Sequence, residues 1–120
     1  MDYLSSLPLL LECQQTDTNL FFKIKLEKSL FCFDGHFPGF PVLPGVVQIH
    51  WAFLFAEKYW GARGRFLALE QIKFIDIVQP EDNTVLNLLL EWNADKQRVA
   101  FEYSIQEKRV SSGRICFSNH

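Results

Sequence analysis

One helix-like segment stands among segments that alternate polar and apolar residues, and this contrast constrains the fold most. The chain runs almost without polar residues from Val46 to Ala56, between Pro44 and Gly61. Proline is tolerated in the first turn of a helix and glycine is favoured just after its end, so these two residues bound a helix of about 16 residues. Because this helix has almost no polar stripe, we expect it to be central to the fold and buried on most sides.

Six other segments have the patterns of strands. They cover residues 8–14, 19–26, 66–74, 84–92, 98–106 and 108–117. The element order is therefore two strands, an irregular segment, one helix and four strands. A single helix is the only apolar partner available to the sheet, so we predict an α+β fold with one curved antiparallel sheet wrapped around that helix. A ferredoxin-like fold would need a second helix, and none of the late segments has helical period.

Size, charge and cysteine content exclude several classes of protein. The 120 residues are enough for one core and few for two, so residues 1–120 are predicted to form a single domain. A net charge of -2 provides no basic field for a nucleic acid. The first residues lack the pattern of a signal peptide, and the longest apolar run is too short to span a bilayer. Three irregularly spaced cysteines indicate reduced thiols, so we expect a cytoplasmic protein that binds no membrane.

The irregular segment from Asp34 to Pro44 brings a histidine to the start of the helix. Its density of glycine and proline excludes regular structure and predicts a shaped loop, which carries His36. The unpaired N–H groups and the dipole of a helix start can stabilise a negatively charged oxygen. An imidazole beside such a site is suited to removing a proton α to a thioester carbonyl. The N–H groups of Gly45 and Phe37 are the predicted donors to the enolate-like oxygen.

The loop sequence resembles that of a known family. Residues 35–45 have the sequence GHFPGFPVLPG, close to the G-H-F-P-x-x-P-x-x-P-G loop of the β-hydroxyacyl-carrier-protein dehydratases of the FabZ and FabA type. Residues 72–74 and 79–82 are similar to the I-K-F strand and the P-G-D turn of that family, so the resemblance covers most of the chain. Residues 42–52 resemble the ApeI-like dehydratases of bacterial aryl polyene clusters, whose substrates resemble fatty acyl intermediates that end in an aromatic ring.

The resemblance implies a fold, a reaction and a set of partners. The fold would be a hotdog homodimer with two active sites at the subunit interface. The substrate would be a (3R)-hydroxyacyl thioester on the phosphopantetheine of an acyl carrier protein, converted to the trans-2-enoyl thioester without a cofactor of the enzyme's own. The loop histidine, His36 here, would act on it together with a helix carboxylate of the other subunit. Twelve Phe, three Trp and three Tyr can fill a core or line a tunnel for such an apolar chain.

One position departs from the family pattern. The family has its carboxylate fourteen residues after the histidine, and this chain has His50 there. Glu57 lies two helical turns further on, about 10 Å along the axis, which is too far for a simple exchange. An imidazole with a reference pKa of about 6.5 can donate a proton to the departing hydroxyl at neutral pH, so we predict a site with two histidines. The alternative for His50 is a structural histidine that is hydrogen-bonded to a carbonyl or across the dimer.

Two other functions are open alternatives. A hotdog thioesterase would use the same oxyanion site to activate the carbonyl towards water, although it usually has a carboxylate near the helix start and this helix has none. A non-catalytic subunit would bind acyl chains, or would pair with another dehydratase in a heterodimer that restores a mixed site. The missing carboxylate motivates this second alternative.

Other chemistry-bearing residues have weaker assignments. Cys32, His36 and His50 suggest a metal site, but the family pattern explains His36 without metal and there is no second close Cys/His pair, so we predict none. Asp34 can orient an imidazole, and an acid before glycine is also common in turns. A basic stretch after the helix can meet an acidic carrier protein, or can form an ordinary solvated face; it comprises Lys58, Arg63 and Arg65.

Overall fold

The predicted helix and strands are all present. The computed structural model describes residues 7–26, 42–61, 64–79 and 84–118. Within these ranges the elements are β1 (Leu9–Gln15), β2 (Asn19–Lys25), α1 (Gly45–Trp60), β3 (Arg65–Phe74), β4 (Val85–Asn93), β5 (Arg98–Ile105) and β6 (Lys108–Ser118). Every bound lies within one residue of its predicted position. In the described ranges, no helix has both the length and the apolar character needed to cross a membrane.

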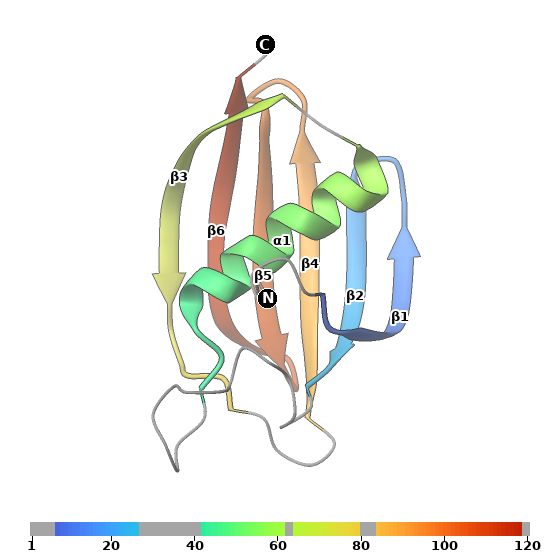
Figure 1. Cartoon of the computed structure of the whole chain (residues 1–120), viewed down its shortest axis with the longest axis vertical. Coiled ribbons are helices and arrows are strands. Elements are labelled where there is room, and N and C mark those ends of the chain that lie inside the picture. Colours follow the sequence, from blue (N-terminus) through green and yellow to red (C-terminus); the bar gives the residue numbers. More distant parts are fainter. Residues whose placement is uncertain (1–6, 27–41, 62–63, 80–83, 119–120) are drawn as a thin grey trace.

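The strands form one antiparallel sheet in the order β1-β2-β4-β5-β6-β3. Helix α1 crosses one face of this sheet diagonally, beginning near β3 and ending near β1 and β2 (Figure 1). A hydrogen bond from the side chain of Gln15 to the carbonyl oxygen of Tyr59, 3.4 Å long, joins β1 to the end of the helix. Strands β1 and β3 therefore form the two edges, and the start of α1 lies at the β3 edge.

The core lies between the sheet and α1. Along β4 every second residue is fully buried, namely Leu86, Leu88 and Leu90, as expected of a sheet with one covered face. From the helix, Val47, Trp51, Ala52, Phe55 and Ala56 face these strands. Burying each large apolar side chain contributes roughly 1.5–3 kcal/mol, so this shared face holds α1 against the sheet.

The helix is fully buried on one face and half-buried on much of the rest, which is less burial than its apolar sequence predicted. Ile49, His50 and Phe53 are half-buried, and Val46 is 57% exposed. These four residues recur at the spacing i, i+3, i+4 and i+7, so they form one stripe along the helix. Within the described residues, the sheet covers this apolar stripe only in part, and the stripe borders a cleft at the β3 edge.

Both helix ends lie at the proline and the glycine that predicted them. Pro44 is the residue before the first turn, with φ -62° and ψ 146°, and its carbonyl oxygen accepts from the N–H groups of Val47 and Gln48. Gly61 has φ 81°, a left-handed conformation that favours glycine, and its N–H donates to the carbonyl oxygen of Glu57 at 2.9 Å. Pro44 was expected in the first turn of the helix. It lies just before that turn instead, so the helix begins one residue later than expected.

Candidate functional site

An apolar cleft of about 250 Å³ opens between the first half of α1 and the edge strand β3. The described residues that line it come from α1, β3 and β6: Val46, Ile49, His50, Phe53, Phe66, Leu69 and Ile115. His50 is the one titratable side chain among them. An apolar cleft with a single well-placed polar group is typical of sites that bind an apolar ligand in one orientation.

The imidazole of His50 lies in a row of aromatic rings. It stacks on Phe53 with ring centroids 6.3 Å apart and an angle of 14° between the rings. Phe53 in turn stacks on Phe117 at 6.0 Å. No hydrogen bond to the imidazole comes from the residues described, so within them the structural alternative of a carbonyl partner has no support. As far as the described residues go, the ring nitrogens can therefore meet a ligand in the cleft.

The first turn of α1 has no negative group of its own. It contains no acidic residue, and no side chain in the described part of the chain caps it. None of the described residues accepts from the first two helical N–H groups, those of Gly45 and Val46, so these groups are suited to meet a negatively charged oxygen. A Cβ at Gly45 would lie 2.5 Å from the ring of Phe74, so glycine lets β3 approach the helix start closely.

A buried polar network, which the sequence analysis did not identify, holds the helix start against the sheet. Gln48 is 3% exposed, and its side-chain nitrogen donates to the carbonyl oxygen of Leu43 at 3.2 Å. Its side-chain oxygen accepts from the hydroxyl of Ser111 at 2.7 Å, and its main-chain oxygen accepts from the hydroxyl of Tyr103 at 2.7 Å. Burial raises the pKa of Tyr103 well above its usual value, so this phenol stays protonated and donates. The signal in the sequence was a lone glutamine on the apolar face that also carries Ala52 and Phe55.

Several residues singled out from the sequence lie outside the described residues. These are Cys32, Asp34, His36, Phe37 and Arg63. The described ranges contain no cluster of three or more potential metal ligands. Glu57 is exposed on α1 and is not among the residues that line the cleft, so the structure supports setting it aside as the missing carboxylate.

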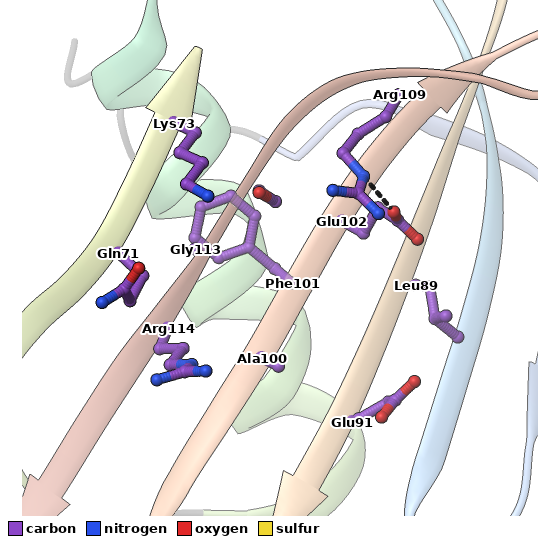
Figure 2. A pocket seen from close by; sticks show the side chains of 11 residues that line it. Gln71, Lys73, Leu89, Glu91, Ala100, Phe101, Glu102, Arg109, Gly113 and Arg114 are labelled. Atoms are coloured by element: carbon purple, nitrogen blue, oxygen red, sulfur yellow. Dashed lines mark hydrogen bonds and ion pairs between the residues drawn. The ribbon is translucent and has the colours of Figure 1, made fainter. Parts of the chain in front are cut away.

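A second hollow, of about 280 Å³, lies on the sheet face away from α1 (Figure 2). Small residues such as Ala100 and Gly113 lie among long charged ones, and Arg109 is ion-paired with Glu102 across it. The sheet separates this hollow from the helix start and from His50. We therefore place the candidate site in the apolar cleft.

Comparison with known proteins shows the family to which the chain belongs. Residues 12–114 match a family model described as ApeI-like, ApeI dehydratase. A 3-hydroxyacyl-[acyl-carrier-protein] dehydratase FabZ of Lactobacillus helveticus is 33% identical over 93 residues, which make up 71% of this chain and 63% of the relative. The chain thus spans less than two thirds of the length of that relative.

Two solved structures share the architecture. A chain of the dehydratase heterocomplex ApeI:P from Xenorhabdus doucetiae matches with a TM-score of 0.83 and 30% identity, over 91% of this chain and 96% of that one. An uncharacterized protein from Erwinia carotovora subsp. atroseptica matches with a TM-score of 0.74 and 35% identity, over 90% of each chain. The single helix against a six-stranded antiparallel sheet is the hotdog fold of dehydratases, which confirms the predicted fold class. The chain belongs to the ApeI-like dehydratase family.

Proposed function

We propose that this protein is a hydro-lyase that removes water from a (3R)-3-hydroxyacyl thioester on an acyl carrier protein. The product is the trans-2-enoyl thioester. The observation that carries the proposal is His50 in an apolar cleft, on the same first turns of α1 as Gly45, whose N–H group is a proposed donor to the oxyanion. A proton donor and an oxyanion site then lie along the same wall of a space suited to an acyl chain. The FabZ relative, named for this reaction, supports the assignment.

The proposed reaction divides the chemistry between two histidines. Neutral His36 removes a proton from C2, and the negative charge that develops on the thioester oxygen is held by the N–H groups of Gly45 and Phe37. Protonated His50 gives its proton to the hydroxyl on C3, which leaves as water while the C2–C3 double bond forms. His36 ends protonated and His50 ends neutral, and exchange with water restores both. No metal or enzyme-bound cofactor takes part.

The aromatic lining supports an acyl chain that is conjugated or ends in an aromatic ring, as in aryl polyene biosynthesis. The rings of His50, Phe53 and Phe66 line the cleft, and Phe53 stacks on both His50 and the buried ring of Phe117. Planar unsaturated chains stack on such rings more favourably than saturated chains of equal length. Fatty acid biosynthesis would use the same reaction on saturated chains.

The test is incubation of the purified protein with 3-hydroxyacyl-carrier proteins, followed by mass analysis. Loss of one water supports the dehydratase, whereas free carrier thiol would favour the alternative of a hotdog thioesterase. An unchanged substrate with both the wild type and His50→Glu would contradict the proposal and would favour a non-catalytic acyl-binding subunit. Paired substrates of equal length, one ending in an aromatic ring and one saturated, test the preference for aryl chains.

We propose that a second chain pairs with β3 and closes the cleft. Strand β3 is an edge of the sheet, and large apolar side chains are exposed along it and just after it: Phe66, Leu67, Leu69, Phe74, Ile75 and Ile77. An exposed apolar edge strand is a template for pairing with another chain. Because β3 also borders the cleft, the pair would bury the site at its interface. A homodimer is the first candidate.

Replacing Leu67 with glutamate is expected to break this pairing. The side chain is 64% exposed and does not line the cleft, so the added charge would be buried in the interface without altering the site itself. We expect sedimentation to change from dimer to monomer, with activity per chain falling in parallel. Leu11→Glu on the opposite edge strand is the matched control, since Leu11 is 53% exposed. A Leu67→Glu protein that remains dimeric and active would refute pairing through β3.

A heterodimer with another dehydratase subunit is the alternative assembly. The structural neighbour from Xenorhabdus doucetiae is a heterocomplex, which supports testing it for this chain. Native mass determination of the complex isolated from its host separates the two cases. Two equal masses support the homodimer, and a second, different chain supports the heterodimer.

The carrier protein and the location of the reaction complete the proposal. Lys58 and Arg65 are exposed at the end of α1 and the start of β3, where an acidic carrier protein can contact them. We propose a cytoplasmic location, supported by the free thiols of Cys13 and Cys116.

A further inference from the structure

Gln48 joins the helix start to elements that are distant in the sequence. Its side chain contacts Leu43, in the segment that leads into the helix, and Ser111 on β6. Its main chain contacts Tyr103 on β5. Leu43 is held in turn by its N–H group, which donates to the carbonyl oxygen of Val78 at 2.7 Å. Four segments of the chain therefore meet at one buried glutamine.

A glutamine at this position is not needed to fill the core. Its neighbours on the buried face of α1 are apolar, among them Val47 and Trp51, and Ser111 and Tyr103 are fully buried as well. Polar groups lose their hydration on burial, and only hydrogen bonds within the protein offset that free-energy cost. A buried network in which every hydrogen bond is made restricts the elements that it joins to one arrangement.

The arrangement set by the Gln48 network determines the positions of His50 and of the first-turn N–H groups. Gln48 and His50 are two residues apart, so they project about 200° apart around the helix, one towards the sheet and the other towards the cleft. A rotation of α1 by about 20° would move a side chain that reaches some 6 Å from the axis by about 2 Å. The same rotation would turn the N–H groups of Gly45 and Val46. Displacements of about 1 Å can cost a reaction about 100-fold.

We propose that Gln48 is a positioning residue: its hydrogen bonds to Leu43, Ser111 and Tyr103 set the direction of His50 and of the first-turn N–H groups for dehydration. The proposal rests on the proposed function. Gln48 does not contact the substrate, because it lies on the sheet side of the helix and does not line the cleft. Its contribution is to hold α1 in a single rotation.

The experiment compares Gln48→Met, Gln48→Glu and Ser111→Ala in the full chain with two independent readouts. One is kcat and KM on a 3-hydroxyacyl-carrier protein, and the other is the nitrogen NMR signal of the His50 ring, assigned with His50→Phe. Methionine keeps the length of glutamine and removes its hydrogen bonds. Leu20→Ala is the control for lost stability, since Leu20 is fully buried on β2 and pairs with Gln15 near the end of α1.

We expect Gln48→Met to shift the His50 signal and to lower kcat about 10- to 100-fold, with KM changed by less than about threefold. Ser111→Ala should change kcat and the His50 signal in the same direction as Gln48→Met, but by a smaller amount. If Gln48→Met does not fold, Ser111→Ala tests the positioning role in its place. Leu20→Ala should lower the melting temperature and leave both readouts unchanged.

Gln48→Glu adds a signature that a loss of packing cannot imitate. When protonated, the introduced carboxyl can donate to Leu43 and accept from Ser111, as the glutamine does. Burial raises the pKa of such a carboxyl, so kcat relative to wild type should be highest at low pH and fall as the group ionises.

The two readouts separate the possible failures. A wild type that does not dehydrate any carrier substrate would refute the proposed function, and the NMR signal would still report whether Gln48 orients His50. A His50 signal that does not move in Gln48→Met or Ser111→Ala would overturn the positioning role. An unchanged kcat in an active protein, or an equal loss in Leu20→Ala, would overturn it as well.

Discussion

Replacement of His36 with alanine is expected to lower kcat for dehydration by about 10²- to 10⁴-fold, the range that a positioned general base contributes. The thioester still binds, because the cleft between α1 and β3 is formed by other residues, so KM should change little. Without an imidazole to accept the proton from C2, water becomes the base. The measurement is the rate of enoyl product formation under saturating substrate.

His120→Ala is the matched control for His36→Ala, since it removes an imidazole outside the loop motif and is expected to leave the rate unchanged. The assignment of His36 depends on its loop motif, as this residue lies outside the described ranges. A His36→Ala protein with near wild-type turnover would show that the loop histidine is not the base. The two-histidine scheme would then be abandoned.

Replacement of His50 separates its chemical role from a structural one. His50→Phe keeps a ring that can stack on Phe53 and removes the proton donor, and we expect kcat to fall about 10²- to 10⁴-fold. His50→Glu restores the carboxylate of the FabZ and FabA type at this position and should retain much more activity than His50→Phe. The rates of both variants are measured with the same carrier-bound substrate.

Melting temperatures of the two His50 variants provide the control for folding. The side chain is half-buried and faces the open cleft, so neither change should disturb the core beneath α1. Turnover by His50→Phe at the wild-type rate would identify His50 as part of the aromatic wall alone. Low activity in both variants, with unchanged stability, would mean that the site requires an imidazole at this position.

The types and bounds of the elements could be predicted because they depend on local patterns. Apolar residues at every second position, such as Leu86, Leu88 and Leu90, indicate which face of a strand is covered. Pro44 and Gly61 mark the helix ends through their own backbone preferences. The departure at position 50 was found by counting along a motif. Each of these signals is contained within a stretch of fewer than 20 consecutive residues.

The order of the strands and the layout of the site were not predictable in this way. That β3 lies beside β6 at an edge, with its apolar side chains exposed, results from pairing between residues 37 to 53 positions apart. The predicted burial of α1 on most sides was too broad for the same reason, because one sheet face covers only one face of a helix. Gln48 could be noticed as a polar residue, but its partners Tyr103 and Ser111 are 55 and 63 residues away.

The sequence by itself determined the single helix, the six strands, the loop motif and the histidine in place of a carboxylate. These follow from residue preferences and spacings, which act over a few ångströms along the chain. Only the tertiary structure decided that His50 opens into an apolar cleft beside the edge strand β3, and that a buried glutamine joins the helix start to β5 and β6. Those features arise when distant segments bury their apolar faces together. The free energy of that packing depends on the whole fold and not on any local stretch of sequence.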